Sequence, residues 1–395
     1  MTAKNGWMRS FRLLGCLMAV AMLASALFAS VASAKKAEPT NPTAYINMGD
    51  SVSFGYTNEK FVLNYPAEPP SAFEGGYPNL VAAKLAKKEA KLGNKLSLLN
   101  LACPGESSKG LIGNGPIAEG LEAAKETTKF TGGEAPCGWH NSSGLPRHVE
   151  FGSVSQLEAA VGILQSAAKK EGPEIKDITL QIGSNDELHK LGECANEAYL
   201  AAHGFTSFIE CVTVEAKNTL FPMIINNLGL TVHVLRTPIA EGGGGYTGPI
   251  SILGFYNPQA FLVGGSDGLQ KALDEALDAT VSGGGFGPAV TVADPFKKTN
   301  ATGKKSATSL EKLDTELKAI CTYTEECNPF DRKLNYEKKH EVTFTAEEWA
   351  AFEAPLNEKF EQGKPGGAFL EGDIHPTPAG DELFAKLVGA ALKKA

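Results

Sequence analysis

The sequence lacks the residue spacings that usually hold a metal ion or a dinucleotide. Its seven cysteines and seven histidines contain no C-x-x-C and no H-x-x-x-H pair, so no zinc site is expected. Gly243, Gly245 and Gly248 do match the spacing of a dinucleotide fingerprint. However, Pro238 follows the preceding apolar run and Pro249 comes directly after the motif, so no helix opens there. We therefore interpret these glycines as a flexible loop.

Positive charge is also scarce. The chain carries 37 lysines and arginines against 45 acidic residues, which gives a formal net charge of −8. A nucleic-acid partner would require a basic patch, so none is expected, and the net charge gives no reason to expect attraction to an anionic membrane. The apolar run from Leu13 to Phe28 is short for a membrane span, so no stable span is predicted. Fixed-period repeats and heptads are missing.

The amino terminus has the pattern of a secretory signal peptide. Lys4, Arg9 and Arg12 precede the apolar run, and the small residues 32–34 supply a cleavage site. Cys16 stands at the front of the apolar run rather than behind it, so we interpret it as filler rather than a lipid-attachment site. Removal of residues 1–34 takes away three cations and no acid, so the net charge of the mature chain becomes −11. We predict a secreted protein.

Six cysteines remain in the mature chain, an even number that suits an oxidising compartment. They allow many connectivities, but their spacing favours pairs of neighbours. The predicted pairs are Cys103 with Cys137, Cys194 with Cys211, and Cys321 with Cys327.

Apolar strand-like runs alternate with helical patterns along the mature chain. The predicted strands are 44–48, 96–102, 177–183, 230–237 and 289–295, and the predicted helices are 78–92, 153–170, 209–228, 267–281 and 378–394, with weaker helical signals near 309–320 and 346–360. This alternation predicts an α/β protein with a parallel sheet and helices on both faces. We expect one domain over 35–395, with loop insertions at about 103–150, 241–265 and 296–370.

Four polar groups follow predicted strands or precede the last helix. Ser51 stands in "GDS", Gly105 in "CPGESS", Asn185 in "GSND" and His375 in "DIHP". Functional groups of parallel sheets gather at the carboxyl ends of the strands. A histidine can take the proton of a serine as the serine attacks an ester, and amide donors can stabilise the resulting oxyanion. The backbone N–H groups of Ser51 and Gly105 and the side chain of Asn185 are the natural donors, with His375 as the base.

The ordered set of four blocks resembles the SGNH, or GDSL, hydrolase superfamily, and it frames nearly the whole mature chain. The signal peptide, the cysteine in "NLACPG" and the layout of six cysteines are similar to its secreted esterase/lipase branch. This resemblance implies a three-layer α/β/α sandwich with a five-stranded parallel sheet. It also implies ester hydrolysis without a cofactor, acting on small-molecule or lipid esters.

One position departs from the family pattern. The family usually places an aspartate three residues before the histidine, but position 372 is glycine here and the acid is Asp373, only two residues before His375. A direct hydrogen bond between side chains two apart on an extended segment is strained. We therefore expect a main-chain carbonyl near Gly372 to orient His375, with Asp373 as the alternative. Asp373→Asn would then cost little activity.

A second serine and the other histidines have simpler interpretations. Ser266 lies in a G-x-S-x-G pattern, but Asp267 as an N-cap with Gln270 explains this stretch without chemistry. We expect Asp186 to brace the loop after the third strand and His233 to lie inside a strand. The histidines expected to face solvent are His140, His148, His189, His203 and His340.

Taken together, these features predict a monomeric, secreted serine ester hydrolase of the esterase or lipase type. Two alternatives stay open: a carbohydrate O-acetylesterase, and a catalytically silent binding protein on the same scaffold. Aromatic residues after Ser51 and within 246–263 could form an acyl pocket or could pack the core under long loops.

Overall fold

The computed structural model describes residues 41–395 except for 124–132, 196–209, 258–265, 301–308, 326–331 and 363–372. The predicted signal peptide, residues 1–34, lies outside the described residues.

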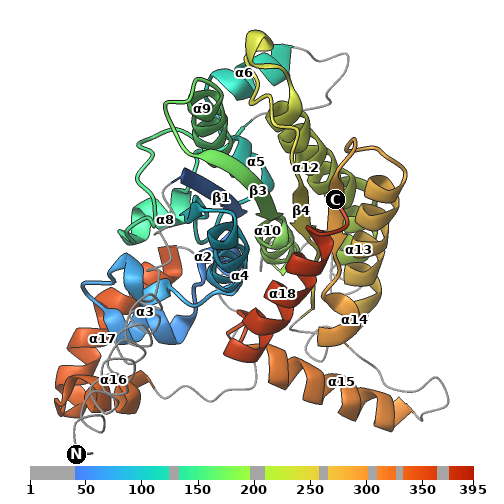
Figure 1. Ribbon diagram of the computed structural model, residues 1–395. Coiled ribbons are helices and arrows are strands. Elements are labelled where there is room, and N and C mark those ends of the chain that lie inside the picture. Colours follow the sequence, from blue (N-terminus) through green and yellow to red (C-terminus); the bar gives the residue numbers. More distant parts are fainter. Residues whose placement is uncertain are drawn as a thin grey trace, which may run out of the picture.

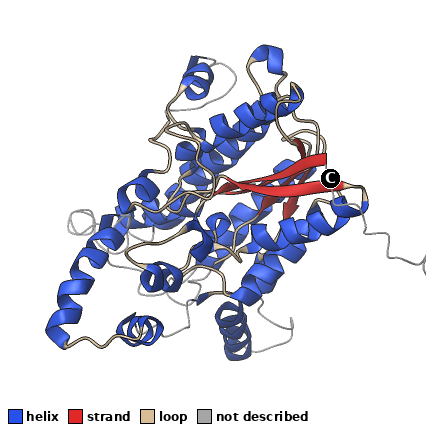
Figure 2. Ribbon diagram, turned by 60° about the vertical axis from the view of Figure 1, so that its left-hand side comes forward, coloured by secondary structure: helices blue, strands red, loops and turns tan. Residues whose placement is uncertain are grey.

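Five parallel strands form one sheet in the order β2-β1-β3-β4-β5. They are β1 (Asn41–Gly49), β2 (Asn94–Asn100), β3 (Glu174–Gln181), β4 (Ile250–Leu253) and β5 (Val290–Ala293). Helices cover both faces of the sheet, as Figure 1 and Figure 2 show from two directions. The predicted three-layer α/β/α architecture with a five-stranded parallel sheet is therefore confirmed.

The helices form two layers and several shorter connections. One layer contains α5 (Ser108–Ile112), α9 (Gln156–Ala168), α12 (Phe221–Arg236) and α13 (Ser266–Ser282), and the other contains α4 (Tyr77–Lys91) and α18 (Pro378–Ala391). The connections include α2 (Ser51–Phe54), α3 (Asn58–Asn64), α6 (Pro116–Ala123), α8 (Gly138–Ser143), α10 (Ser184–Ala195), a π-helix (Cys211–Leu220), α14 (Phe296–Thr299), α15 (Ser309–Tyr323), α16 (Arg332–His340) and α17 (Ala346–Gln362), with short 3-10 turns at Pro70–Phe73 and Ile239–Glu241.

Each face of the sheet has its own apolar core. Ile46 and Met48 of β1 are fully buried and pack with the layer that contains α9, α12 and α13. Tyr45, also fully buried, belongs to the core under α4 and α18. Side chains that alternate between two covered faces produce a continuous apolar run in the sequence, which is why this strand could be predicted.

The strand predicted over 230–237 is wrong, because these residues continue α12. Its buried residues follow helical spacing from Ile224 through Leu228 to Thr231 and Leu235, and the Thr231 hydroxyl donates to the Asn227 carbonyl at 2.8 Å. The fourth strand is instead β4, within the stretch expected to be a loop insertion. Short apolar runs fit a strand and a buried helix equally well. His233 consequently lies on α12 and is exposed, not inside a strand.

The weak helical signals near 309–320 and 346–360 are confirmed by α15 and α17. Helices α16 and α17 lie beside α3, as Figure 1 shows. A third apolar core joins them to the segment after Ser51, through Phe54, Phe61, Phe73, Tyr336 and Trp349. These aromatic residues therefore pack a core.

Two of the three predicted disulfides are confirmed. Cys103 bonds Cys137 with a Cα–Cα distance of 5.4 Å, and Cys194 bonds Cys211 with a Cα–Cα distance of 5.8 Å. Cys327, the predicted partner of Cys321, lies outside the described residues. Among the helices that the structure describes, none has both the length and the apolar character needed to cross a bilayer.

Candidate active site

The strand order places a topological switch point at the carboxyl ends of β1 and β3. From β1 the chain moves to β2 on one side and then to β3 on the other. In open parallel sheets, ligands bind outside the carboxyl ends of the strands where the order reverses in this way. Ser51 follows the end of β1 by two residues, and Asn185 follows the end of β3 by four. The topology thus brings two of the predicted site residues to this point.

The loop that carries Ser51 is fixed against the end of β3. Gly49 has a φ of 145°, and a Cβ there would lie 1.9 Å from the Gln181 carbonyl oxygen, so only glycine fits. Asp50 N-caps α2, because its Oδ1 accepts from the Val52 N–H at 3.0 Å, and its Oδ2 accepts from the Gln181 amide at 3.1 Å. Ser51 is therefore the first residue of a capped helix, and it is half-buried.

The groups around Asp50 shift its pKa. Its burial raises the pKa to about 7, while hydrogen bonds from Val52 and Gln181 and the nearby charge of His375 act in the opposite direction. The Asp50 carboxyl, which is next to Ser51 in the sequence, is therefore close enough to His375 for the two charges to interact.

His375 is paired with Asp373, which corrects the expectation of a main-chain carbonyl. His375 Nδ1 lies 2.5 Å from Asp373 Oδ1, and the same oxygen accepts from the His375 backbone N–H at 3.2 Å. This turn, in which an aspartate bonds the backbone two residues on, brings the carboxylate to the ring without an extended segment. Gly372 lies outside the described residues.

Asp373 is anchored on its other side as well. Its Oδ2 accepts from the Asn58 backbone N–H at 2.7 Å, which ties the 373–375 segment to the start of α3. Burial alone would raise the pKa of Asp373, yet the charge and hydrogen bond of His375 and the Asn58 N–H hold it below its usual value. Asp373 is therefore an ionised partner for an imidazolium.

The His375 ring approaches the Ser51 loop through Tyr56. The two rings meet edge to face with centroids 4.9 Å apart, and the Tyr56 N–H donates to the Ser51 carbonyl at 3.0 Å. Nε2 of His375 is buried and has no hydrogen-bond partner in the described part of the chain, so it does not bond the Ser51 hydroxyl in this structure. Catalytic hydrogen bonds are often long in unliganded enzymes and tighten when substrate binds.

Gly105 and Asn185 lie next to each other. Gly105 has a φ of 75°, the left-handed region that glycine adopts readily. The Asn185 side-chain amide donates to the carbonyl of Glu106, the next residue along, at 2.9 Å. The two predicted oxyanion donors therefore come from neighbouring loops.

Gln156 and Glu106 join these loops to β1, and the sequence interpretation missed both. Gln156 is fully buried; its Oε1 accepts from the Gly49 N–H at 2.8 Å, and its Nε2 donates to the Gly49 carbonyl at 2.9 Å and to Glu106 Oε2 at 3.1 Å. Glu106 Oε2 also accepts from the Cys137 N–H at 3.0 Å. The one signal in the sequence is the capping box of Ser155 and Glu158, which makes Gln156 the first residue of α9.

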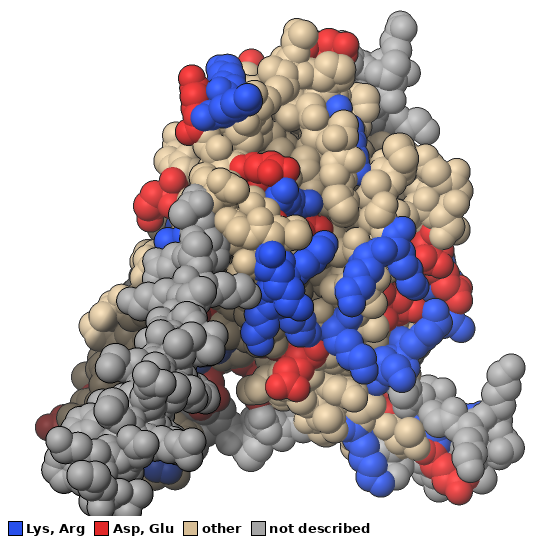
Figure 3. Space-filling model, viewed as in Figure 1, with Lys and Arg blue, Asp and Glu red and all other residues tan. Residues whose placement is uncertain are grey.

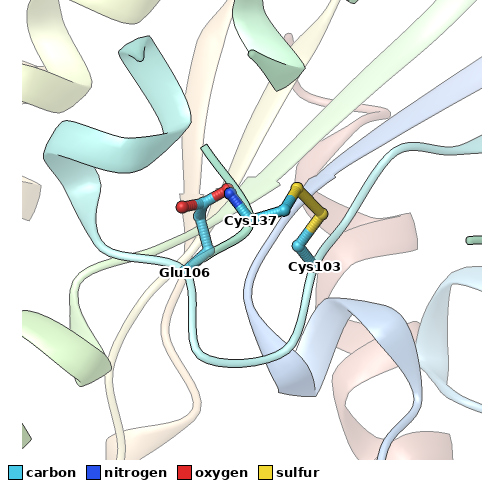
Figure 4. Close-up of side chains that lie close together, drawn as sticks. All are labelled: Cys103, Glu106 and Cys137. Atoms are coloured by element: carbon cyan, nitrogen blue, oxygen red, sulfur yellow. A yellow bond between two sulfur atoms is a disulfide. The ribbon is translucent and has the colours of Figure 1, made fainter. Parts of the chain in front are cut away.

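Glu106 does not form a metal site with its neighbours. Burial raises its pKa to about 8, against hydrogen bonds from Cys137 and Gln156 that lower it. Cys103, Glu106 and Cys137 are the one group of at least three His, Cys, Asp or Glu residues within ligand range among the described residues. Figure 4 shows the two sulfurs bonded to each other. Because metal binding requires thiolates, this disulfide leaves Glu106 as the only available ligand of that group.

Other predicted residues have structural roles or lie elsewhere. Asp186 braces the β3 loop against α5, since its carboxylate accepts from the Ser108 N–H and hydroxyl, both at 2.8 Å. Ser266 begins α13, and its side chain and the preceding Gly264 and Gly265 lie outside the described residues. The remaining histidines divide by exposure: His189 and His340 are exposed as expected, His148 is half-buried, and His203 lies outside the described residues.

His140 was expected to face solvent, but it is only 1% exposed. It packs against Phe54, and neither ring nitrogen has a hydrogen-bond partner among the described residues. Burial, and then the charges of Arg147 and His148, lower its pKa to about 3. The folded state therefore keeps this ring neutral.

Replacement of His140 by phenylalanine is expected to reduce acid sensitivity. An unfolded histidine binds a proton below a pKa of about 6.5, whereas folded His140 does so only near pH 3. Stability is therefore lost as the pH falls between these values, by roughly 3 to 5 kcal/mol in full. Urea unfolding at neutral and acidic pH should show a smaller fall for His140→Phe than for wild type. Exposed His233→Gln is the control, and an unchanged pH dependence in His140→Phe would contradict this assignment.

The known proteins that resemble this chain do so at low sequence identity. No family model matches the chain, and no curated protein matches it. Several solved structures do. The lipase Lip_vut3 from a goat rumen metagenome has 16% identity, covers 70% of this chain and 94% of its own, and has a TM-score of 0.35.

Two further structures are similar to the same degree. A member of the lipolytic G-D-S-L family from Veillonella parvula has 13% identity, with 87% of this chain and 95% of its own covered and a TM-score of 0.31. An acetyl xylan esterase from Geobacillus stearothermophilus has 11% identity, with 71% and 95% covered and a TM-score of 0.31. These scores are too low to carry the fold or the function, which rest on the topology and the side chains described above.

Proposed function

We propose that this protein is a serine ester hydrolase of the esterase or lipase type. Ser51 is the nucleophile and His375 is the general base. The observation that carries the proposal is the pair of Asp373 and His375, whose Nδ1 and Oδ1 lie 2.5 Å apart while Nε2 is buried and free to accept a proton. A histidine that is paired with a carboxylate and packs on Tyr56, in the loop that follows a strand-end serine, supports an acyl-transfer site.

The reaction follows from these groups. Nε2 of His375 takes the Ser51 proton as Ser51 Oγ bonds the ester carbonyl carbon, and the carbonyl oxygen becomes an oxyanion. Asp373 stabilises the imidazolium that forms. The imidazolium then protonates the leaving alcohol as its C–O bond breaks, which leaves an acyl-enzyme on Ser51. Water, deprotonated by His375, attacks this ester, and the acid leaves as Ser51 regains its proton.

Three amide groups supply the oxyanion site in this proposal. They are the backbone N–H groups of Ser51 and Gly105 and the side chain of Asn185. Asn185 Nδ2 carries two hydrogens and donates to the Glu106 carbonyl at 2.9 Å. Its second hydrogen can therefore serve the oxyanion.

The wider setting is also a proposal. Residues 1–34 direct secretion, the mature chain acts as a single monomeric domain, and its substrates are small-molecule or lipid esters. Two disulfides, Cys103–Cys137 and Cys194–Cys211, are compatible with an oxidising compartment.

An acyl-length series of p-nitrophenyl esters, from acetyl to palmitoyl, tests the proposed activity. We expect hydrolysis by the wild type and none above background by Ser51→Ala. Turnover of the acetyl ester alone would favour a carbohydrate O-acetylesterase. No turnover of any ester would favour a binding protein on the same scaffold.

Gln156→Leu is expected to lower kcat by about a hundredfold, with a smaller change in KM. The variant loses three hydrogen bonds that hold Gly49 and Glu106 together, so the Ser51 and Gly105 loops can shift relative to each other, and a displacement of about 1 Å can cost this much in rate. Gln165→Leu is the matched control, because Gln165 lies on the same helix and donates to the Gly243 carbonyl, away from the site. A folded Gln156→Leu variant with wild-type kcat would contradict this positioning role.

A further inference from the structure

Helix α4 carries a stripe of four lysines that form no ion pair in the described part of the chain, although half-buried Asp177 of β3 lies within electrostatic reach of Lys88. Lys84, Lys87, Lys88 and Lys91 are all exposed, and their spacing places them on one side of the helix. The acidic residue of α4, Glu89, is buried. The outward side of this helix is therefore cationic over its last two turns.

Lysines on and just after α18 extend this surface, although α18 also carries the exposed Glu382 four residues before Lys386. The Tyr77 N–H donates to Asp381 Oδ1 at 2.8 Å, which joins the first turns of α4 and α18, and the two helices lie side by side over the same core. Both run from the carboxyl edge of the sheet to its amino edge. Figure 3 shows lysine and arginine side chains gathered over this part of the molecule. The exposed lysines added by α18, the chain end and the edge strand β2 are Lys386, Lys393, Lys394 and Lys95.

Ion pairs do not neutralise the lysines of this surface. Some described lysines elsewhere on the chain form ion pairs at 2.7 to 3.7 Å: Lys176, Lys190, Lys271, Lys297 and Lys333. None of the eight lysines above has an ion-pair partner within the described ranges, although the chain as a whole carries a net charge of −8. A helix dipole favours lysine in the last turn, which accounts for Lys88 and Lys91 but not for Lys84 or Lys386.

An exposed apolar side chain lies at the end of the stripe. Leu92, the C-cap of α4, is 65% exposed and directly follows Lys91. An apolar side chain next to lysines is the combination that binds the headgroup region of an anionic membrane. We propose that the surface formed by α4, α18 and Lys95 binds an anionic phospholipid surface. The net charge of −8 gave no reason to expect such attraction, because a sum over the whole chain does not show where the lysines gather.

This proposal does not depend on ester hydrolysis. The site lies at the carboxyl ends of β1 and β3, whereas the last lysines of α4 and α18 lie toward the opposite edge of the sheet. Membrane binding there would leave the Ser51 loop uncovered. Ester hydrolysis and vesicle binding can therefore be tested independently, and either proposal can fail while the other holds.

Co-sedimentation with vesicles tests the surface. At low salt we expect the full chain to bind vesicles of phosphatidylcholine mixed with phosphatidylglycerol and not vesicles of phosphatidylcholine alone. Each lysine near such a surface contributes about fivefold in affinity, and about 0.5 M NaCl should release the protein. We expect at least about a tenfold loss of binding when all four α4 lysines become glutamine: Lys84→Gln, Lys87→Gln, Lys88→Gln and Lys91→Gln.

A second quadruple variant matches the first in charge and chemistry. It changes four lysines outside this surface, and it should bind anionic vesicles like the wild type: Lys176→Gln, Lys190→Gln, Lys271→Gln and Lys333→Gln. Circular dichroism and melting temperature establish that both variants fold. Equal binding by the two quadruple variants, or equal binding to neutral vesicles, would overturn the proposal. Binding to soluble inorganic polyphosphate but not to vesicles would overturn it too, and would indicate a polyanionic polymer instead.

Discussion

Replacement of His375 by alanine is expected to lower kcat/KM for a p-nitrophenyl ester by about 10⁵-fold. Removal of the base leaves the Ser51 hydroxyl protonated and hence a weak nucleophile, and losses of this order follow when a catalytic histidine is removed from such a site. His375 is buried, and Nε2 is its one ring nitrogen without a partner in the described part of the chain. The measurement is kcat/KM at neutral pH.

His189→Ala is the control for this substitution. His189 lies on α10, the helix that also carries Asn185, but it is exposed. It should retain wild-type activity. A loss of less than about tenfold in a folded His375→Ala variant would show that His375 is not the base.

Asp373→Asn is expected to lower kcat by about 10⁴-fold with little effect on KM. The carboxylate fixes the His375 ring through a 2.5 Å contact and stabilises the imidazolium, and asparagine supplies neither the charge nor the acceptor on the correct atom without reorientation. Steady-state kinetics with the p-nitrophenyl esters give this value. Asp278→Asn, an exposed residue on α13, is the control.

The Asp373→Asn result also separates two accounts of how His375 is oriented. A main-chain carbonyl near Gly372, as the sequence suggested, predicts a loss of only a few fold. The side-chain pair predicts a large one. Asparagine keeps one oxygen that can accept from the Asn58 N–H, so the segment should stay anchored, and the melting temperature will show whether it does.

Most of the sheet could be predicted from apolar runs because its central strands are covered on both faces. β1 gives such a run from Ala44 to Met48. β4 could not be found in this way, since it has only 4 residues and lies among glycines. The stretch 230–237 was misassigned because its buried side chains continue the inward face of α12, a pattern that a short window does not distinguish from a strand.

The candidate site also has residues that could be predicted from the sequence and residues that could not. Ser51, Gly105 and Asn185 could be placed because the ends of parallel strands meet at one edge of the sheet. The role of Asp373 depended on a local turn, which its spacing from His375 alone did not reveal. Gln156 could not be found, because its bonds to Gly49 span 107 positions and only the folded chain brings the two together. For the same reason, His140 could not be recognised as buried.

Labelling with a fluorophosphonate probe tests most directly whether His375 activates the Ser51 hydroxyl. The probe reacts only with a serine whose proton is removed as it attacks, and peptide mass spectrometry identifies the labelled residue. In the folded wild type we expect a single label on the peptide that contains Ser51, and we expect none in His375→Ala or in denatured protein. A label on Ser266 instead, or equal labelling of Ser51 with and without His375, would contradict the proposed site.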